Sequence, residues 1–107
     1  MSEDGGDRVP GSGASSQDAE IRVLEIVNKK GLHARASAKF VQTVERFDAS
    51  VRVTRGNETV GGTSIMGLMM LGAATGTRIT ISATGNEAAA AADALEKLVS
   101  SGFGEED

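Results

Sequence analysis

Residues 21–47 read IRVLEIVNKKGLHARASAKFVQTVERF, a stretch in which a strand pattern gives way to a helix pattern across a short loop. Residues 21–27 are rich in β-branched side chains, which predicts a strand, and residues 28–31 end it. Apolar side chains then recur at helical spacing at Ala36, Phe40, Val41, Val44 and Phe47. The stretch therefore predicts a strand, a loop and an amphipathic helix in that order.

His33 is the only histidine of the chain, and the pattern places it at or next to the N-cap of this helix. Arg35 follows in the first turn, where the helix dipole disfavours a cation. An anion would resolve that conflict, because free backbone N–H groups, the dipole and the guanidinium all favour negative charge there. We expect a phosphoryl group on His33 to be that anion, and an exposed histidine that merely caps the helix is the alternative.

The length and composition allow one compact domain and exclude several classes of function. The chain has 107 residues, a formal net charge of −4, three Phe and neither Trp nor Tyr, so nucleic-acid binding is not expected. There is no cysteine and only one histidine, so we expect no metal site and no cofactor.

The two ends of the chain are predicted to lie outside the domain. Residues 1–19 are rich in Gly, Ser, Asp and Glu, which predicts a disordered N-terminal tail. They hold no apolar run, so we expect neither a signal peptide nor a membrane anchor, and a cytoplasmic location. The domain is expected over residues 20–103, with a frayed acidic end from Phe103 that leaves residues 104–107 outside the domain.

The remaining elements follow from periodicity. Residues 50–54 and 58–61 form a predicted hairpin around the turn at 55–57, and residues 77–84 form a last strand. Gly85-Asn86 is expected to open a final helix, whose buried stripe is Ala88, Ala91, Ala92, Leu95, Leu98 and Val99. With a short helix at 64–71, the order is β-α-β-β-α-β-α. This order predicts an α+β fold with a four-stranded antiparallel sheet and three helices on one face.

The short helix lies within residues 63–72, which read TSIMGLMMLG. Ser64 is its predicted N-cap, and a phosphate on that hydroxyl would interact favourably with the helix dipole. A plain capping serine is the alternative. Gly67 inside the helix weakens it by about 1 kcal/mol relative to alanine, which indicates close approach of another backbone or a partner.

Apolar side chains in this helix divide into two groups. One face is expected inward and holds Ile65, Leu68 and Leu71. The methionines at 66, 69 and 70 lie off that face, and flexible thioethers on a surface suit a patch that binds several partners. Burial of most of these side chains in so small a domain is the alternative.

Together, GLHARASA at residues 31–38 and TSIMGLMMLG at residues 63–72 resemble the HPr family, the histidine-containing phosphocarriers of the bacterial phosphotransferase system. The resemblance covers residues 21–102 and includes the interval between the two motifs. It implies an open-faced β-sandwich, a four-stranded antiparallel sheet under three helices, in agreement with the element order derived above.

The resemblance also implies roles for individual residues. His33 matches the histidine that carries the phosphoryl group on Nδ1, and Arg35 matches the arginine that accompanies that group. Ser64 matches the regulatory serine modified by HPr kinase/phosphorylase. An apolar patch that docks enzyme I, IIA proteins and that kinase is matched by Ile65, Met66 and Met69.

The function implied is that of a phosphocarrier rather than an enzyme. It would accept a phosphoryl group from enzyme I, ultimately from phosphoenolpyruvate, and pass it to IIA proteins as a monomer, with regulation by serine phosphorylation. The alternative is a regulatory binding module that is switched at Ser64 and has no carrier duty. The sequence identifies neither the downstream IIA protein nor the role of the tail.

Three residues depart from the common family pattern. Ala36 replaces the usual proline, and Gln42 and Glu45 stand where sugar-transporting members often carry lysines. With the methionine-rich helix and the intact Ser64, these residues resemble HPr proteins of alphaproteobacterial, nitrogen-type phosphotransferase systems. The resemblance implies that the relay ends on regulatory IIA proteins.

Overall fold

The computed structural model describes residues 19–105. In chain order its elements are β1 (Glu20–Glu25), α3 (Ala34–Glu45), β2 (Ser50–Arg55), β3 (Glu58–Gly61), α4 (Ile65–Met70), β4 (Arg78–Thr84), α5 (Ala88–Ser100) and the 3₁₀ turn η2 (Gly102–Gly104). The tail predicted over residues 1–19 lies outside the described residues except for Ala19, as do the last two residues of the acidic end.

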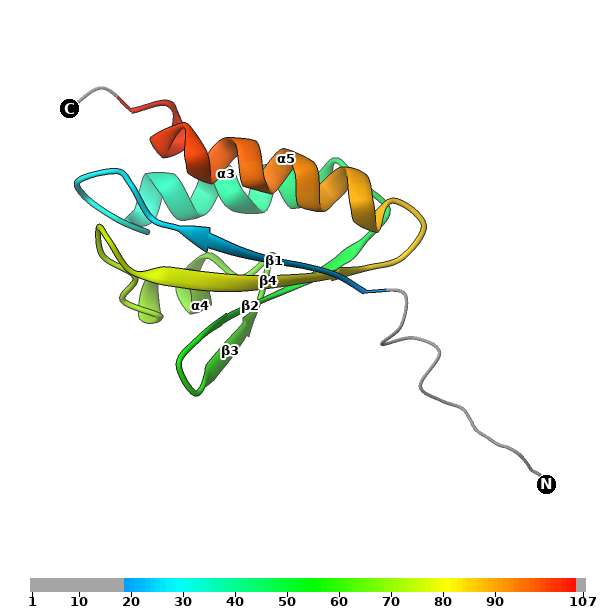
Figure 1. Ribbon diagram of the computed structural model, residues 1–107, viewed down its shortest axis with the longest axis horizontal. Helices are drawn as coiled ribbons and strands as arrows, with labels where there is room; N and C mark the ends of the chain where they lie inside the picture. The colour runs from blue at the N-terminus through cyan, green and yellow to red at the C-terminus, as the bar shows by residue number, and fades with distance from the viewer. Residues whose placement is uncertain (1–18, 106–107) are drawn as a thin grey trace.

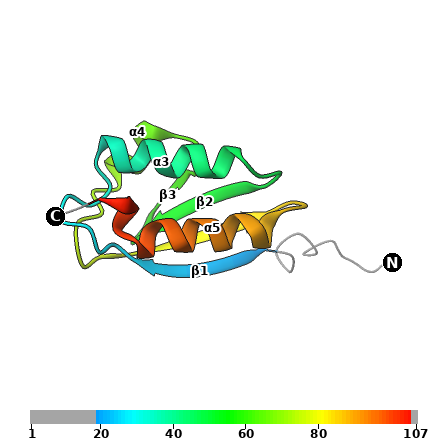
Figure 2. The ribbon, with the colours of Figure 1, turned by 90° about the horizontal axis from the view of Figure 1, so that it is seen from above.

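The strands form one antiparallel sheet in the order β1-β4-β2-β3. Helices α3 and α5 lie side by side over one face of this sheet, and α4 lies beyond α3 near β3 (Figures 1 and 2). The predicted α+β fold and the predicted hairpin are confirmed.

The core lies between the sheet and its two long helices. Alternate residues of the central strand β4 point inward, and Ile79, Ile81 and Ala83 are fully buried. Phe40 of α3 and Leu95 of α5 cover them and are also fully buried. This packing fixes α3, and therefore its N-terminal end, against the sheet.

The start of α5 differs from the prediction. The helix begins at Ala88, two residues beyond the expected Gly85-Asn86 opening. The Asp48 N–H donates to the Glu87 carboxylate at 2.7 Å, and the Asn86 amide donates to the Asp48 carboxylate at 2.9 Å. These side chains therefore tie the turn before α5 to the loop after α3 instead of continuing the helix.

The prediction of a frayed end from Phe103 is wrong as far as Glu105. Phe103 is fully buried, and the Glu105 side chain keeps 15% of its exposed area. Phe103 stands alone among glycines and acidic residues in this part of the sequence. It is held because the turn after α5 brings it back over the core.

Among residues 19–105, every helix falls short of the length and apolar character that crossing a bilayer requires.

Candidate functional site

The loop before α3 is fixed by a backbone contact with the segment after α4. The Leu32 N–H donates to the Ala73 carbonyl at 3.0 Å, and Gly31 has a φ of 65°. A Cβ on Gly31 would lie 2.3 Å from the Ala73 oxygen, so no other residue fits this backbone without movement. The loop therefore holds His33, which follows Leu32, at a defined position.

His33 is the N-cap of α3, as predicted, and its imidazole makes the cap. Nδ1 accepts a hydrogen bond from the Arg35 N–H at 3.2 Å, while the His33 carbonyl accepts from the Ser37 N–H at 2.8 Å. A nitrogen that accepts from an amide carries no proton. In the neutral imidazole, Nδ1 therefore holds the lone pair at the positive end of the helix, and the proton resides on Nε2.

The second ring nitrogen faces the end of the chain. His33 Nε2 contacts the Glu105 carboxylate, and the Asn28 side-chain amide donates to the other Glu105 oxygen at 3.1 Å. The same amide donates to the Gly31 carbonyl at 2.9 Å. Asn28 is 2% exposed, so it forms a buried bridge between the loop and the carboxylate.

The electrostatic balance at Glu105 favours its charged form. Burial opposes ionisation, but hydrogen bonds from His33 and Asn28 and the positive charge of Lys39 outweigh it. The pKa of Glu105 is consequently lowered from its ordinary value of 4.5. The carboxylate next to the imidazole is therefore ionised near neutral pH.

A hollow of about 680 Å³ opens beside the imidazole. The residues that line it are Lys30, His33, Ala34, Arg35, Lys39, Gly104 and Glu105. Lys30 and Arg35 are exposed, and Lys39 Nζ donates to the Phe103 carbonyl at 2.7 Å. Three cations and the Glu105 carboxylate thus line one hollow at the helix start, and the cations and the helix start attract an anion.

Sequence reasoning found His33 and Arg35 but missed the residues around them. Glu105 lies in the segment predicted to fray, and Asn28 lies in the predicted turn after the first strand. Lys39 lies on the first helix, at a position to which the sequence assigned no role. One signal was present: Phe103 is the only large apolar residue near the C-terminus and lies between two glycines. Such a residue often marks a segment that returns to the core.

Ser64 is the N-cap of α4, as predicted, and its Oγ accepts from the Gly67 N–H at 3.0 Å. Gly67 allows this because a Cβ there would lie 2.9 Å from Ser64 Oγ and 3.0 Å from the Val60 Cβ. The close approach inferred from Gly67 is therefore to β3 and to the cap itself. The Ser64 hydroxyl is exposed.

Helix α4 presents an apolar surface, which we name the methionine patch. Its members are Ile65, Met66, Met69 and Met70, with exposed fractions of 40%, 68%, 40% and 76%. The outward orientation predicted for the methionines is confirmed. Ile65 is exposed, so its inward orientation with Leu68 and Leu71 is wrong, while its exposure agrees with the apolar patch in which the resemblance places it. A six-residue helix buries only Leu68, because one turn and a half presents a narrow face to the core.

The methionine patch and His33 lie at the same end of the molecule. Helix α4 packs against α3, and the segment that follows α4 accepts the Leu32 hydrogen bond described above. Figure 2 shows α4 beside the start of α3, with the C-terminal turn close to the same loop. One partner surface can therefore contact the patch and the imidazole together.

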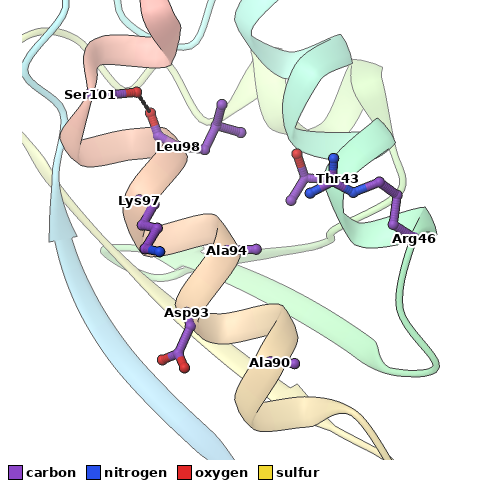
Figure 3. Close-up of a pocket in the computed structure, with 8 residues that line it drawn as sticks. All are labelled: Thr43, Arg46, Ala90, Asp93, Ala94, Lys97, Leu98 and Ser101. Carbon is purple, nitrogen blue, oxygen red and sulfur yellow. Dashed lines mark hydrogen bonds between the residues drawn. The ribbon is translucent and has the colours of Figure 1, made fainter.

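A second hollow, of about 710 Å³, lies between α3 and α5 (Figure 3). Thr43 and Arg46 line one side, and the alanines of α5 line the other. Asp93 on its rim is already engaged by Arg22 at 2.9 Å. The hollow contains none of the predicted site residues, so it is separate from the candidate site.

Comparison with known proteins gives consistent matches. Residues 21–101 match a family model described as the PTS HPr component phosphorylation site. The phosphocarrier protein HPr of Neisseria meningitidis is 52% identical over 82 residues, which are 77% of this chain and 92% of that protein. The phosphocarrier protein HPr of Cupriavidus necator is 45% identical over 78% of this chain and 94% of its own length. The crystal structure of HPr-C-His from Thermoanaerobacter tengcongensis has a TM-score of 0.78 and 43% identity, covering 82% of this chain and 99% of that one.

Proposed function

Because this chain belongs to the HPr family and is a phosphocarrier of the phosphotransferase system, we propose that His33 accepts a phosphoryl group from enzyme I and passes it to IIA proteins. The observation that carries this proposal is the position of Nδ1, which accepts from the Arg35 N–H at the start of α3 beside a hollow lined by Lys30, Arg35 and Lys39. A phosphoryl group needs both a free lone pair and donors for its oxygens, and this position supplies them.

The transfer proceeds by nucleophilic displacement at phosphorus. The Nδ1 lone pair of His33 attacks the phosphorus of phosphorylated enzyme I, a new N–P bond forms, and the bond between phosphorus and the donor atom of enzyme I breaks with its electron pair returning to that atom. The phosphoryl oxygens then replace Nδ1 as acceptor of the Arg35 N–H. In the second step the IIA nucleophile attacks the same phosphorus and the pair returns to Nδ1.

Holding the phosphoryl group too tightly would stop the relay. Arg35 is exposed and, among residues 19–105, its guanidinium has no carboxylate partner, so it is free to meet phosphoryl oxygens while remaining in water. Charge-assisted bonds to exposed groups are moderate in strength. The domain offers binding and orientation, while the acid/base and metal chemistry belongs to the partners.

Incubation with phosphoenolpyruvate and enzyme I tests the carrier role. We expect the chain to gain one acid-labile phosphoryl group, and we expect His33→Ala to abolish it. His33→Asn is the second variant, because asparagine caps helices well and keeps α3 intact. An adduct that persists in either variant would exclude His33 as the carrier residue.

We further propose that phosphorylation of Ser64 by HPr kinase/phosphorylase regulates the encounter with enzyme I. The support is the exposure of the Ser64 hydroxyl at one end of the methionine patch, because a phosphate there places negative charge beside an apolar docking surface. Regulation by binding without carrier duty is the alternative. The site assembled around His33 favours the carrier role with regulation added.

Two variants of Ser64 separate charge from capping. Ser64→Asp should slow phosphorylation of His33 by enzyme I roughly tenfold. The reason is that a carboxylate without a partner at an apolar interface weakens the binding of enzyme I. Asparagine has nearly the same size as aspartate and also caps helices, but it carries no charge. Ser64→Asn should therefore retain the wild-type rate. Equal rates in Ser64→Asp and the wild type would contradict the proposed regulation.

The narrower assignment to an alphaproteobacterial, nitrogen-type system remains a prediction based on Ala36, the methionine-rich helix and the intact Ser64. The two phosphocarriers named above, from Neisseria meningitidis and Cupriavidus necator, do not come from the alphaproteobacterial branch. A transfer assay with the labelled chain distinguishes the branches. Faster transfer to a nitrogen-type IIA protein than to a sugar-type one supports the assignment, and the reverse order contradicts it.

A further inference from the structure

Arg55, the last residue of β2, is a cation on the side of the sheet that the helices cover. Val51 and Val53 of the same strand are buried on that side, and alternation along a strand places Arg55 there as well. The hairpin that β2 forms with β3 lies next to α4 (Figure 1). The N–H groups of a guanidinium on this side need an acceptor among the neighbouring elements.

The acceptor belongs to α4. Arg55 Nη1 donates to the Leu71 carbonyl at 3.1 Å, across a separation of 16 positions in the chain. Glu58 is the register partner of Arg55 across the hairpin, yet no ion pair within residues 19–105 joins Arg55 to Glu58 or to another carboxylate. The guanidinium therefore binds the end of α4 and not the neighbouring strand.

Helix α4 has few means of its own to stay in place. It has six residues, none of them charged, and it buries only Leu68. Helices this short are not stable in isolation, because the cost of the first turn is spread over too few hydrogen bonds. Leu71 is the C-cap, and a cation at the last carbonyls of a helix satisfies an acceptor and complements the helix dipole. Arg55 thus supplies from the hairpin the charge that the helix lacks.

Packing between α4 and the hairpin is close at one place and open beside it. Gly67 lies so near β3 that a Cβ on it would be 3.0 Å from the Val60 Cβ. A hollow of about 270 Å³ lies between the two elements, and Met70 and Leu71 at the C-terminal end of α4 line one side of it. The Arg55 hydrogen bond therefore fixes the end of the helix that packing leaves open.

The carbonyl that Arg55 binds is close in sequence to the contact that fixes His33. Ala73, two residues after Leu71, accepts from the Leu32 N–H at 3.0 Å, and Leu32 directly precedes His33. The segment from 71 to 73 is therefore held by the hairpin on one side and holds the loop before α3 on the other. The position of the methionine patch relative to the imidazole depends on this segment.

We infer that Arg55 is a positioning residue for phosphoryl transfer: its guanidinium holds the C-terminal end of α4 and so keeps the methionine patch in the place from which a docked enzyme I reaches His33. This inference rests on the proposed carrier function and on docking through the patch. Arg55 touches neither His33 nor the residues around its hollow. It therefore acts on formation of the complex and not on the chemical step.

The variant Arg55→Met tests the inference, because methionine has a similar unbranched stem but no donor and no charge. Initial rates of phosphorylation by phosphorylated enzyme I are measured over a range of concentrations of the full chain. We expect KM for the chain to rise roughly fivefold to tenfold while kcat stays within about twofold of the wild type, because one charge-assisted hydrogen bond is lost and the imidazole is intact.

A second measurement is made without enzyme I. The N–H groups of Leu71 and Gly72 close the last turn of α4, and amide hydrogen exchange by NMR reports how often that turn opens. In Arg55→Met these two amides should exchange several times faster, whereas the Ser37 amide of α3 should exchange as in the wild type. Since enzyme I is absent, this measurement separates positioning of α4 from a direct contact between Arg55 and the partner.

Two further variants complete the design. Arg55→Lys keeps a cation that can donate to the Leu71 carbonyl, so its KM and its exchange rates should lie closer to the wild type than those of Arg55→Met. Arg52→Met removes the same charge from an exposed position on the other face of β2, and it should match the wild type in both measurements. Urea unfolding of each variant identifies any loss of folded protein.

The outcomes separate this inference from the carrier function on which it rests. If the wild type forms no phosphoryl adduct with enzyme I, the carrier function fails and the inference fails with it. If the adduct forms but Arg55→Met has the wild-type KM, the positioning role fails alone. A raised KM with unchanged exchange in α4, or an equal rise in Arg52→Met, would also overturn it, because those results indicate a direct contact or a general effect of charge.

Discussion

The two ring nitrogens of His33 have different neighbours, and this asymmetry decides which of them reacts. Nδ1 accepts from the backbone of α3, whereas Nε2 meets the Glu105 carboxylate. A nitrogen that holds its proton against a carboxylate has no lone pair to offer. In the proposed transfer, Nδ1 is therefore the nucleophile, and Arg35 is free to meet the incoming oxygens.

Arg35 gives the first prediction. Arg35→Ala should slow phosphorylation of His33 by roughly tenfold to a hundredfold, because a hydrogen bond to a charged group contributes about 1.5–3 kcal/mol. Arg35 is exposed, so the fold should not change. Single-turnover rates with enzyme I provide the measurement.

The matched control is Arg52→Ala, which removes an exposed arginine from the sheet. It should leave the rate unchanged. Comparable slowing in both variants would mean that overall charge, and not the guanidinium beside His33, sets the rate.

At the scale of elements, the joint between β1 and α3 places the histidine. Gly31 turns the chain with a positive φ, and its backbone lies in close contact with the segment after α4. The loop before α3 and the segment after α4 therefore meet at this glycine. Arg55 at the hairpin reinforces this end of the molecule by donating to the Leu71 carbonyl at 3.1 Å. The position of the imidazole thus depends on α4 as well as on its own helix.

A pair of glycine variants tests this joint. Gly31→Ala should lower the free energy of unfolding by more than about 3 kcal/mol, since left-handed strain adds to a backbone clash. Gly56→Ala has a similar φ of 61° but meets nothing within 4 Å, so it should lose only about 1 kcal/mol. Urea unfolding measures both, and equal losses would contradict the role given to the contact with Ala73.

At the scale of the whole molecule, periodicity was enough to predict the sheet, the helices and the end at which His33 lies. The alternation of apolar side chains in β4 and the helical spacing of Phe40 and Val44 are local patterns, and they can be read from the sequence without knowledge of distant contacts. Glu105 could not be predicted in the same way, because it reaches His33 across 72 positions of sequence. Ile65 failed for another reason: a short helix has too narrow a buried face for every apolar position in its stripe.

The connection between the C-terminus and the site also gives stability a dependence on pH. The pKa of Glu105 is lower in the folded chain than its ordinary 4.5, so the carboxylate stabilises the fold above that value. This contribution is lost as the pH falls below 4.5 and through the folded-state pKa. The difference in unfolding free energy between the wild type and Glu105→Gln should therefore shrink on acidification.

Urea unfolding of the two proteins at about pH 7 and at steps below 4.5 measures this difference. A difference that stays constant or grows as the solution becomes more acidic would show that the Glu105 carboxylate is not held in its charged form by folding.

The most direct test of the account is to locate the phosphoryl group within the ring of His33. The ¹⁵N-labelled chain is phosphorylated with phosphoenolpyruvate and enzyme I, and phosphorus–nitrogen coupling is read by NMR. We predict coupling to Nδ1, with the proton retained on Nε2 beside Glu105. Coupling to Nε2, or a phosphoryl group on any residue other than His33, would contradict it.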